Sequence, residues 1–206
     1  MKIPQIFPDK NPLVSIHTGG LIRNSYNKQD ISAKNVQAKV RFKANSFDSI
    51  NISEIEFSNM LDDKILIPPR TRSAINKLVK NPDIININSK SINTYNDHDN
   101  RMRKILEHYI SNEEFDTFCD DFRKSELKDE DIVYDKHGDF RVITLFSVEK
   151  ENDRDFQQYL TVILLDLYHL FLPSKHDGKS KEESKKANYN AVRHFSHHIK
   201  EHFLLN

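Results

Sequence analysis

The sequence predicts an α+β fold, with a strand-rich N-terminal portion followed by a mainly helical C-terminal portion that carries an inserted β-hairpin. Two observations lead to this class. Residues 36–44 alternate apolar and polar side chains, which is the period-two pattern of a half-buried strand. Beyond residue 97, apolar side chains recur every three or four residues, as they do in amphipathic helices. We therefore expect a strand-rich basic region over residues 1–95 and a helical region with a hairpin over residues 96–206.

The elements expected in the first region are short. An apolar run at 65–67 stops at two prolines, after which Ser73 is placed to cap a helix over 74–80. The clearest strand is 36–44, and two further segments repeat its pattern in part, 50–57 and 84–95.

The second region is expected to begin with two helices. Asp99 or Asn100 can cap the first, over 101–110. Ser111 and Glu114 have the spacing of a capping box, which opens the second helix and extends it to about Lys124.

A hairpin is expected next, over 132–148. The most apolar segment, 154–172, is interpreted as a central buried helix, because Asp166 and His169 interrupt it too early for a membrane span of about 20 apolar residues. These two side chains are three residues apart and are expected to satisfy each other or to cap a contact between helices. A last helix is expected over 183–205.

The composition excludes several classes of protein. The chain has 206 residues, 37% of them apolar, which suffices for the core of one domain or two small ones. Its one cysteine, Cys119, excludes a disulfide framework and a cysteine-based zinc site. The first twelve residues have no apolar run like that of a secretory signal, so we expect a cytoplasmic protein without membrane association. Four glycines and no nucleotide-binding motif make a phosphate-cradling loop unexpected.

The charges are sorted along the chain, although 31 basic and 31 acidic side chains cancel. Residues 1–95 hold 14 basic and 8 acidic side chains, residues 96–178 hold 11 and 20, and residues 179–206 hold 6 and 3. Segments of opposite charge are expected to dock on each other or on different partners. The alternative is that they are solvated faces with clustered charge.

The C-terminal segment concentrates the side chains that could carry chemistry. Arg193-His194-x-x-x-His198 resembles the R-[N/H/D]-x-x-x-H motif of the HEPN superfamily, helical bundles that include bacterial defence and toxin ribonucleases. The resemblance implies that Arg193 and His198 are the catalytic pair, that His194 orients them, and that two protomers form a cleft that cuts RNA without a metal ion or other cofactor. The chemistry is reasonable, because arginine binds phosphate bidentately and histidine transfers protons near neutral pH.

A metal ion is an alternative interpretation of the same segment. His194 and His198 are four residues apart, a spacing that lets two imidazoles share an ion on a helix. The glutamate of the H-E-x-x-H motif is absent, and the third ligand would have to come from the segment 97–99 or from the acidic residues between 116 and 121. We therefore predict no metal site.

The basic N-terminal region could bind nucleic acid through phosphate contacts. An equally open interpretation is that this surface docks on the acidic segment 96–178 of the same chain. No tryptophan is present, so stacking on bases is not expected. The candidate residues are Lys39, Arg41, Lys43, Arg70 and Arg72.

The leading functional hypothesis is a HEPN-like, RNA-directed protein that acts as a metal-independent endoribonuclease of a bacterial defence or toxin-type system. The alternative is a non-catalytic adaptor or binding subunit of a larger protein or nucleoprotein complex. The partners expected are RNA and either a second protein or a second copy of the chain.

Overall fold

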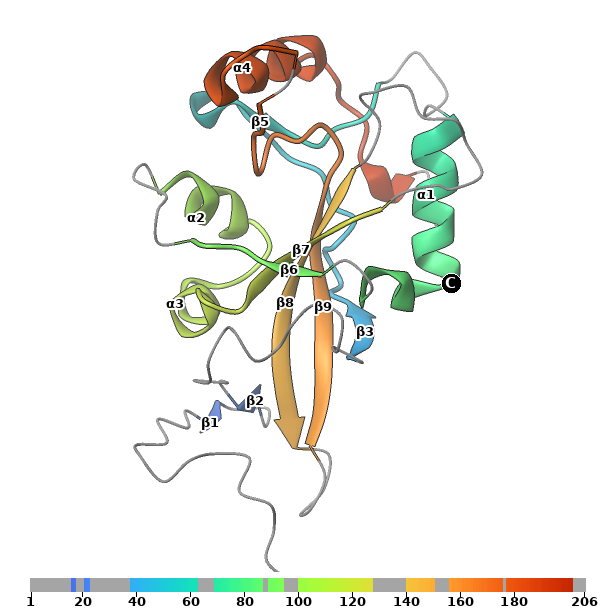
Figure 1. Ribbon diagram of the computed structural model, residues 1–206, viewed down its shortest axis with the longest axis vertical. Helices are drawn as coiled ribbons and strands as arrows, with labels where there is room; N and C mark the ends of the chain where they lie inside the picture. Colours follow the sequence, from blue (N-terminus) through green and yellow to red (C-terminus); the bar gives the residue numbers. More distant parts are fainter. Residues whose placement is uncertain are drawn as a thin grey trace, which may run out of the picture.

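The computed structural model describes residues 16–17, 21–22, 38–62, 69–86, 89–94, 100–127, 140–150, 156–175 and 177–201. A long antiparallel pair of strands lies at the centre, formed by β8 (Arg141–Lys150) and β9 (Phe156–Asp166). Figure 1 shows α1 on one side of this pair and α2 and α3 on the other, with α4 beyond the end at which β9 finishes.

The remaining strands of the sheet attach to the two outer edges of this pair. On one side, β3 (Lys39–Phe42) runs parallel to β9. On the other side, β7 (Phe122–Glu126) pairs antiparallel with β8. The short strand β6 (Lys90–Ser91) then pairs antiparallel with β7. The short strands β1 (Ile16–His17) and β2 (Leu21–Ile22) form a hairpin, and β2 pairs with the far end of β8.

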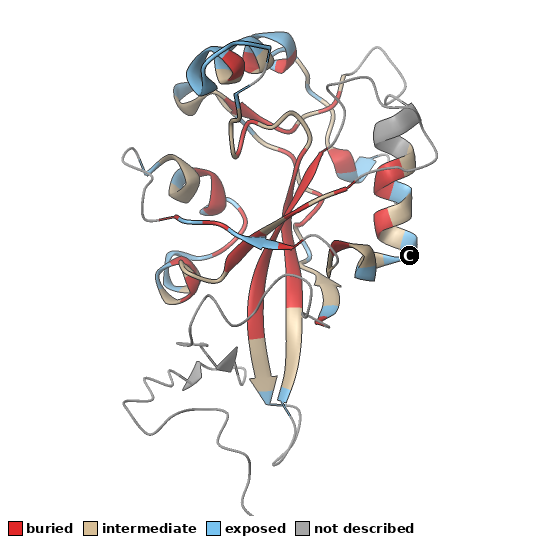
Figure 2. Cartoon of the chain, viewed as in Figure 1, coloured by how far each residue is buried: buried red, intermediate tan, exposed pale blue. Residues whose placement is uncertain are grey.

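Most of β8 is buried on both faces, because its side chains alternate between two separate clusters of apolar residues. Val142 and Phe146 belong to the first cluster, and Ile143 and Leu145 belong to the second. Figure 2 shows that the two long strands are buried through their upper and middle parts and more exposed toward Lys150, the last residue of β8, and Phe156, the first residue of β9. The sheet is therefore the middle layer of the protein.

The first cluster lies between one face of the sheet and α1 (Pro69–Lys80) with the 3-10 helix η3 (Pro82–Asn86). The helix contributes Ile75 and Leu78, both fully buried, and η3 contributes Ile85.

The second cluster lies under three helices and a small hairpin. The helices are α2 (Arg101–Leu106), α3 (Asn112–Phe118) and α4 (Lys181–Val192). The hairpin consists of β4 (Asn51–Ile52), the 3-10 helix η2 (Ser53–Ile55) and β5 (Phe57–Ser58).

The fold class predicted from the sequence is wrong. The C-terminal region is not mainly helical, because it contributes β7, β8 and β9, and a full helix, α1, lies in the region predicted to be strand-rich. The main error is the segment 154–172, which forms β9 and the turn after it instead of a buried helix. A strand that is buried on both faces has a continuous apolar run, and such a run has no period that separates it from a buried helix.

Other predicted elements are confirmed in part. The capping box at Ser111 is present, with its hydroxyl accepting the Glu114 N–H at 3.1 Å, but α3 ends at Phe118 because the chain continues into β7. The strand predicted over 36–44 is present as β3, and the helix predicted over 101–110 is the shorter α2.

Three more predictions differ from the structure. Segment 50–57 is a hairpin with a 3-10 turn, segment 84–95 contains η3 and β6, and the helix predicted over 74–80 already begins at Pro69. Of the predicted hairpin 132–148, the part from 140 onward is described, and β8 begins at Arg141. The rest of that hairpin and the run 65–67 lie outside the described residues.

Asp166, the last residue of β9, organises the turn that follows. Its carboxylate is fully buried and accepts the backbone N–H groups of Leu170 (2.7 Å), Phe171 (3.0 Å) and Leu172 (3.4 Å). His169 has a left-handed backbone with φ of 56°, which turns the chain back toward this carboxylate. The predicted mutual pairing of the Asp166 and His169 side chains is replaced by these backbone contacts.

Among the helices of the described residues, none is long and apolar enough to cross a lipid bilayer.

We expect Asp166→Ala to lower the free energy of unfolding by about 3 kcal/mol or more, because three backbone donors lose their common acceptor inside the protein. Urea denaturation measures the change. Asp116→Ala is the matched control, since that carboxylate is 62% exposed and its ion pair with Arg103 contributes less than about 1 kcal/mol. Equal stability of the two variants would contradict the role assigned to Asp166.

Candidate functional site

The helix expected over 183–205 is half as long as predicted. α4 begins at Lys181, where the Ser180 hydroxyl accepts the Glu183 N–H at 3.2 Å in a second capping box. It ends at Val192, and Arg193 is its C-terminal cap residue. The predicted Arg-His motif therefore does not lie on one helix.

Two contacts from the N-terminal region explain why α4 ends here. The side-chain amide of Asn51 donates to the carbonyl oxygen of Arg193 at 2.8 Å, which satisfies a carbonyl that a longer helix would use. His197, four residues after Arg193, exchanges two backbone hydrogen bonds of 2.8 and 3.1 Å with Leu61. The chain leaves the helix in order to pair with Leu61.

The three predicted catalytic residues are not brought together. Arg193 is exposed and lines a cleft. His194 is exposed, with its ring 4.8 Å from the ring of Phe195. His198 is half-buried, and its Nδ1 accepts the backbone N–H of Ser49 at 3.3 Å. Arg193 thus lines the cleft, whereas His198, the other member of the pair implied by the HEPN resemblance, does not.

The third histidine of the segment has an acidic partner. His197 Nδ1 and Glu201 Oε2 are 2.9 Å apart, and this hydrogen bond lowers the pKa of the Glu201 carboxyl. Among the described residues, no group of three or more histidine, cysteine or acidic side chains could hold a metal ion. The candidate ligands at 97–99 lie outside those residues.

The basic face predicted on β3 is paired with acidic side chains of the middle segment. The Arg41 guanidinium contacts Glu149, and Lys43 Nζ lies 2.8 Å from a Glu114 carboxylate oxygen. Burial opposes ionisation of Glu114, but hydrogen bonds from Lys43 and Ser111 outweigh it and lower the pKa of this carboxyl. These contacts agree with docking of the basic segment on the acidic segment of the same chain.

The other predicted nucleic-acid contacts are spread over different elements. Lys39 is exposed on β3. Arg70 and Arg72 lie in the first turn of α1, and their side chains lie outside the described part of the structure.

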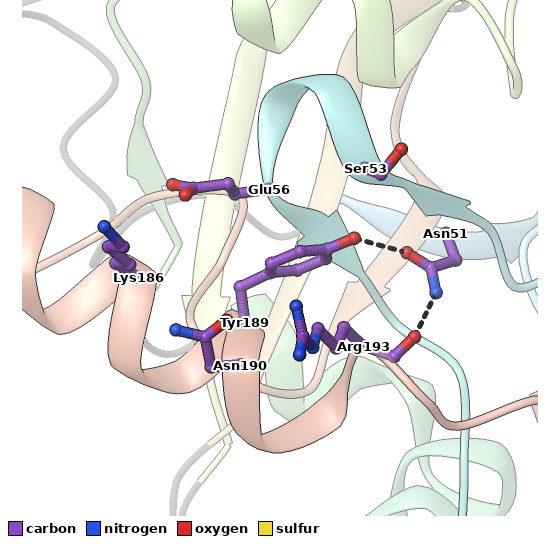
Figure 3. A pocket seen from close by; sticks show the side chains of 7 residues that line it. All are labelled: Asn51, Ser53, Glu56, Lys186, Tyr189, Asn190 and Arg193. Carbon is purple, nitrogen blue, oxygen red and sulfur yellow. Dashed lines mark hydrogen bonds between the residues drawn. The ribbon is translucent and has the colours of Figure 1, made fainter.

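A polar cleft of about 610 Å³ lies between α4 and the β4–β5 hairpin. Figure 3 shows the Tyr189 ring crossing it, with its hydroxyl on Asn51 Oδ1 at 3.1 Å and the Arg193 guanidinium turned back toward Tyr189. The lining residues are Asn51, Ser53, Glu56, Lys186, Tyr189, Asn190 and Arg193.

The hairpin wall of the cleft is held in place by Arg101. Its Nε donates to the carbonyl oxygen of Ile55 at 2.9 Å, and its Nη2 donates to that of Glu56 at 3.3 Å. The same guanidinium donates to the carbonyl oxygens of Leu170 and Phe171 in the turn after β9. The wall is thereby tied to the end of the central strand.

The cleft has more positive than negative charge available. The side chains of Lys186 and Arg193 make no hydrogen bond or ion pair with any described residue, whereas Glu56 already contacts Lys185 Nζ at 3.3 Å. Burial raises the pKa of the Tyr189 hydroxyl, with Arg193 acting in the opposite direction. This tyrosine is therefore a neutral hydrogen-bonding group at physiological pH. The arrangement is suited to an anionic ligand.

Sequence reasoning missed this cleft apart from Arg193. Asn51 is 142 positions from Arg193 in the chain, so no local spacing could reveal their contact. The only sequence signal was the run Lys185-Lys186 followed by Tyr189 and Arg193, which places Lys186 and Arg193 about two helical turns apart.

Comparison of the chain with protein-family models, with curated proteins and with solved structures finds no match. The HEPN resemblance therefore depends on the short motif alone and stays a prediction.

We expect Asn51→Ala to lower the free energy of unfolding by about 1–2 kcal/mol, because Tyr189 loses its hydroxyl partner and α4 loses a donor to its last carbonyl. Chemical denaturation checks this. The control is Asn190→Ala, an exposed position on the same helix that should change stability by less than about 0.5 kcal/mol. If both variants were as stable as the parent protein, Asn51 would not join the two walls.

Proposed function

We propose that this protein is a non-catalytic RNA-binding subunit whose cleft between α4 and the β4–β5 hairpin holds the sugar–phosphate backbone of a single strand. The observation that carries the proposal is the pair of cations in the cleft, Lys186 and Arg193, which have no ion pair among the described residues. Elsewhere the basic side chains of Arg41 and Lys43 are already paired with glutamates. The positive charge of Lys186 and Arg193 is therefore available for phosphate at this cleft.

The donors around Arg193 suit a phosphodiester. A guanidinium binds two phosphate oxygens through parallel N–H groups, and Lys186 adds a point charge about two helical turns away. The Ser53 hydroxyl and the Asn190 amide line the same cleft and add neutral donors. Few apolar side chains line it, which favours a charged polymer over an apolar protein segment.

An acceptor in the cleft favours RNA over DNA. Glu56 Oε2 contacts Lys185, while Oε1 makes no hydrogen bond with a described residue. A free carboxylate oxygen accepts a hydrogen bond from a ribose 2′-hydroxyl, a group that DNA lacks. Glu56 is therefore assigned to sugar recognition.

The geometry favours binding over cleavage. Proton transfer requires the histidine to lie within hydrogen-bond reach of the group that reacts. His198 instead accepts a backbone N–H from Ser49 and does not line the cleft that contains the Arg193 side chain. The endoribonuclease activity implied by the HEPN resemblance needs a second protomer to reunite the two residues, and it stays a prediction.

The binding proposal is tested by fluorescence anisotropy with a labelled single-stranded RNA at several salt concentrations. We expect Arg193→Ala to weaken binding about tenfold, as for the loss of a hydrogen bond to a charged group. The same variant should reduce the slope of log affinity against log salt by about 0.7, because one phosphate contact is lost. Lys181→Ala, an exposed lysine at the start of α4 outside the cleft, is the matched control and should bind like the parent protein.

Equal binding by Arg193→Ala and Lys181→Ala would contradict the proposal. So would binding of a DNA strand of the same sequence as tightly as the RNA, since Glu56 would then have no role in recognising ribose.

The absence of catalysis is tested separately by incubating the protein with labelled RNA in EDTA. We expect the RNA to stay intact with the parent protein and with the Arg193→Ala and His198→Ala variants. Cleavage by the parent protein that is lost in His198→Ala would overturn the non-catalytic proposal and establish the predicted ribonuclease.

A further inference from the structure

A second pocket, of about 230 Å³, lies on the sheet face that α3 covers in part. It shares no residue with the cleft beside α4. The strand register places the side chains of one face together here, since Arg41 is paired with Thr161 and Thr161 with Leu145. The lining residues are Arg41, Phe42, Lys43, Glu114, Leu145, Ser147, Thr161 and Ile163.

Ser147 is the unusual member of this pocket. The residue is 2% exposed, and its hydroxyl has no hydrogen-bond partner. Buried hydroxyl groups are nearly always paired, because leaving one unpaired costs its full desolvation. Ser125 on the neighbouring strand β7 shows the usual case: it is fully buried and donates to the carbonyl oxygen of Ile85 at 2.7 Å.

Arg41 and Lys43, the two cations at the pocket, each have a hydrogen-bond donor that no described residue uses. Arg41 uses Nε for Thr161 Oγ1, at 2.8 Å, and Nη2 for Glu149, so its Nη1 group makes no bond with a described residue. Lys43 Nζ makes two bonds, both to Glu114, and an ammonium has three hydrogens. The pocket therefore offers spare donors from two cations besides the hydroxyl of Ser147.

The charge and the shape of the pocket restrict the ligand. Arg41 and Lys43 are balanced by Glu149 and Glu114, so a dianion such as phosphate would be repelled by two carboxylates, whereas a single negative charge can share the spare donors. Leu145 and Ile163 supply an apolar wall. A ligand group can reach Ser147 when the side chains of Arg41 and Lys43 move aside. Both side chains are long and partly exposed, 40% for Arg41 and 29% for Lys43.

We propose that this pocket is a second binding site, which takes a small monocarboxylate with an apolar body. The carboxylate accepts hydrogen bonds from Ser147 and from the spare donors of Arg41 and Lys43, and the apolar body packs on Leu145 and Ile163. The site is independent of RNA binding at the α4 cleft.

The test titrates the full-length chain with benzoate and follows binding by calorimetry and by the melting temperature. We expect saturable binding to the parent protein, about tenfold weaker binding to Ser147→Ala, and unchanged binding to Arg193→Ala, whose substitution lies in the other cleft. Benzamide, which has the same ring without the charge, and inorganic phosphate should both bind more weakly than benzoate. Failure of RNA binding would leave all these results unchanged, so the two proposals fail separately.

The melting temperature without ligand is a second test, which does not depend on how well a variant binds benzoate. Ser147→Ala should melt at the same temperature as the parent protein or higher, because it removes an unpaired buried hydroxyl, whereas the control Ser125→Ala should melt lower, because it removes a paired one. A lower melting temperature for Ser147→Ala would show that its hydroxyl is already paired and would overturn the proposal. Equal benzoate affinity in Ser147→Ala, no saturable binding of benzoate, or equal affinity for benzamide or phosphate would overturn it too.

Discussion

The antiparallel pairing of β8 with β9 is the interaction on which the other elements depend. Its two faces form the sheet side of both apolar clusters, and its two outer edges pair with β3 and β7. It also positions the cleft, because Asp166 at the end of β9 holds the N–H groups of the following turn. Arg101 then joins the carbonyl oxygens of that turn to the hairpin that forms one wall. The side chains of Asp166 and Arg101 thus connect β9 to the cleft through backbone N–H and carbonyl groups that would otherwise be unpaired.

The sequence revealed those elements of the fold whose signal is local. The capping box at Ser111 and the alternation through β3 involve residues a few positions apart, and both are present in the structure. The run that forms β9 was misinterpreted because the partners that bury its two faces, α1 on one side and α3 on the other, are distant in the chain. Its β-branched Thr161, Val162 and Ile163 were the available sign of a strand.

The candidate site was predictable only at Arg193. Helical spacing through His198 assumed that the helix continued, but the backbone pairing of His197 with Leu61 replaces helical hydrogen bonds that the spacing requires. The partners that define the cleft come from β4 and η2, and only the tertiary structure brings them to α4. Sorted charge was a better guide, because it anticipated the pairing of Arg41 and Lys43 with glutamates of the middle segment, whereas Lys186 and Arg193 stay available at the cleft.

The central claim is that anions bind at the cleft between α4 and the β4–β5 hairpin, and titration of the isotope-labelled chain with single-stranded RNA in two-dimensional NMR spectra tests it most directly. We expect the side-chain amide signals of Asn51 and Asn190 and the Nε–H signal of Arg193 to shift together as RNA is added, since these groups line the cleft. Shifts confined to the segment from His197 to Glu201, or to β3, with no change at those three side chains, would contradict the account.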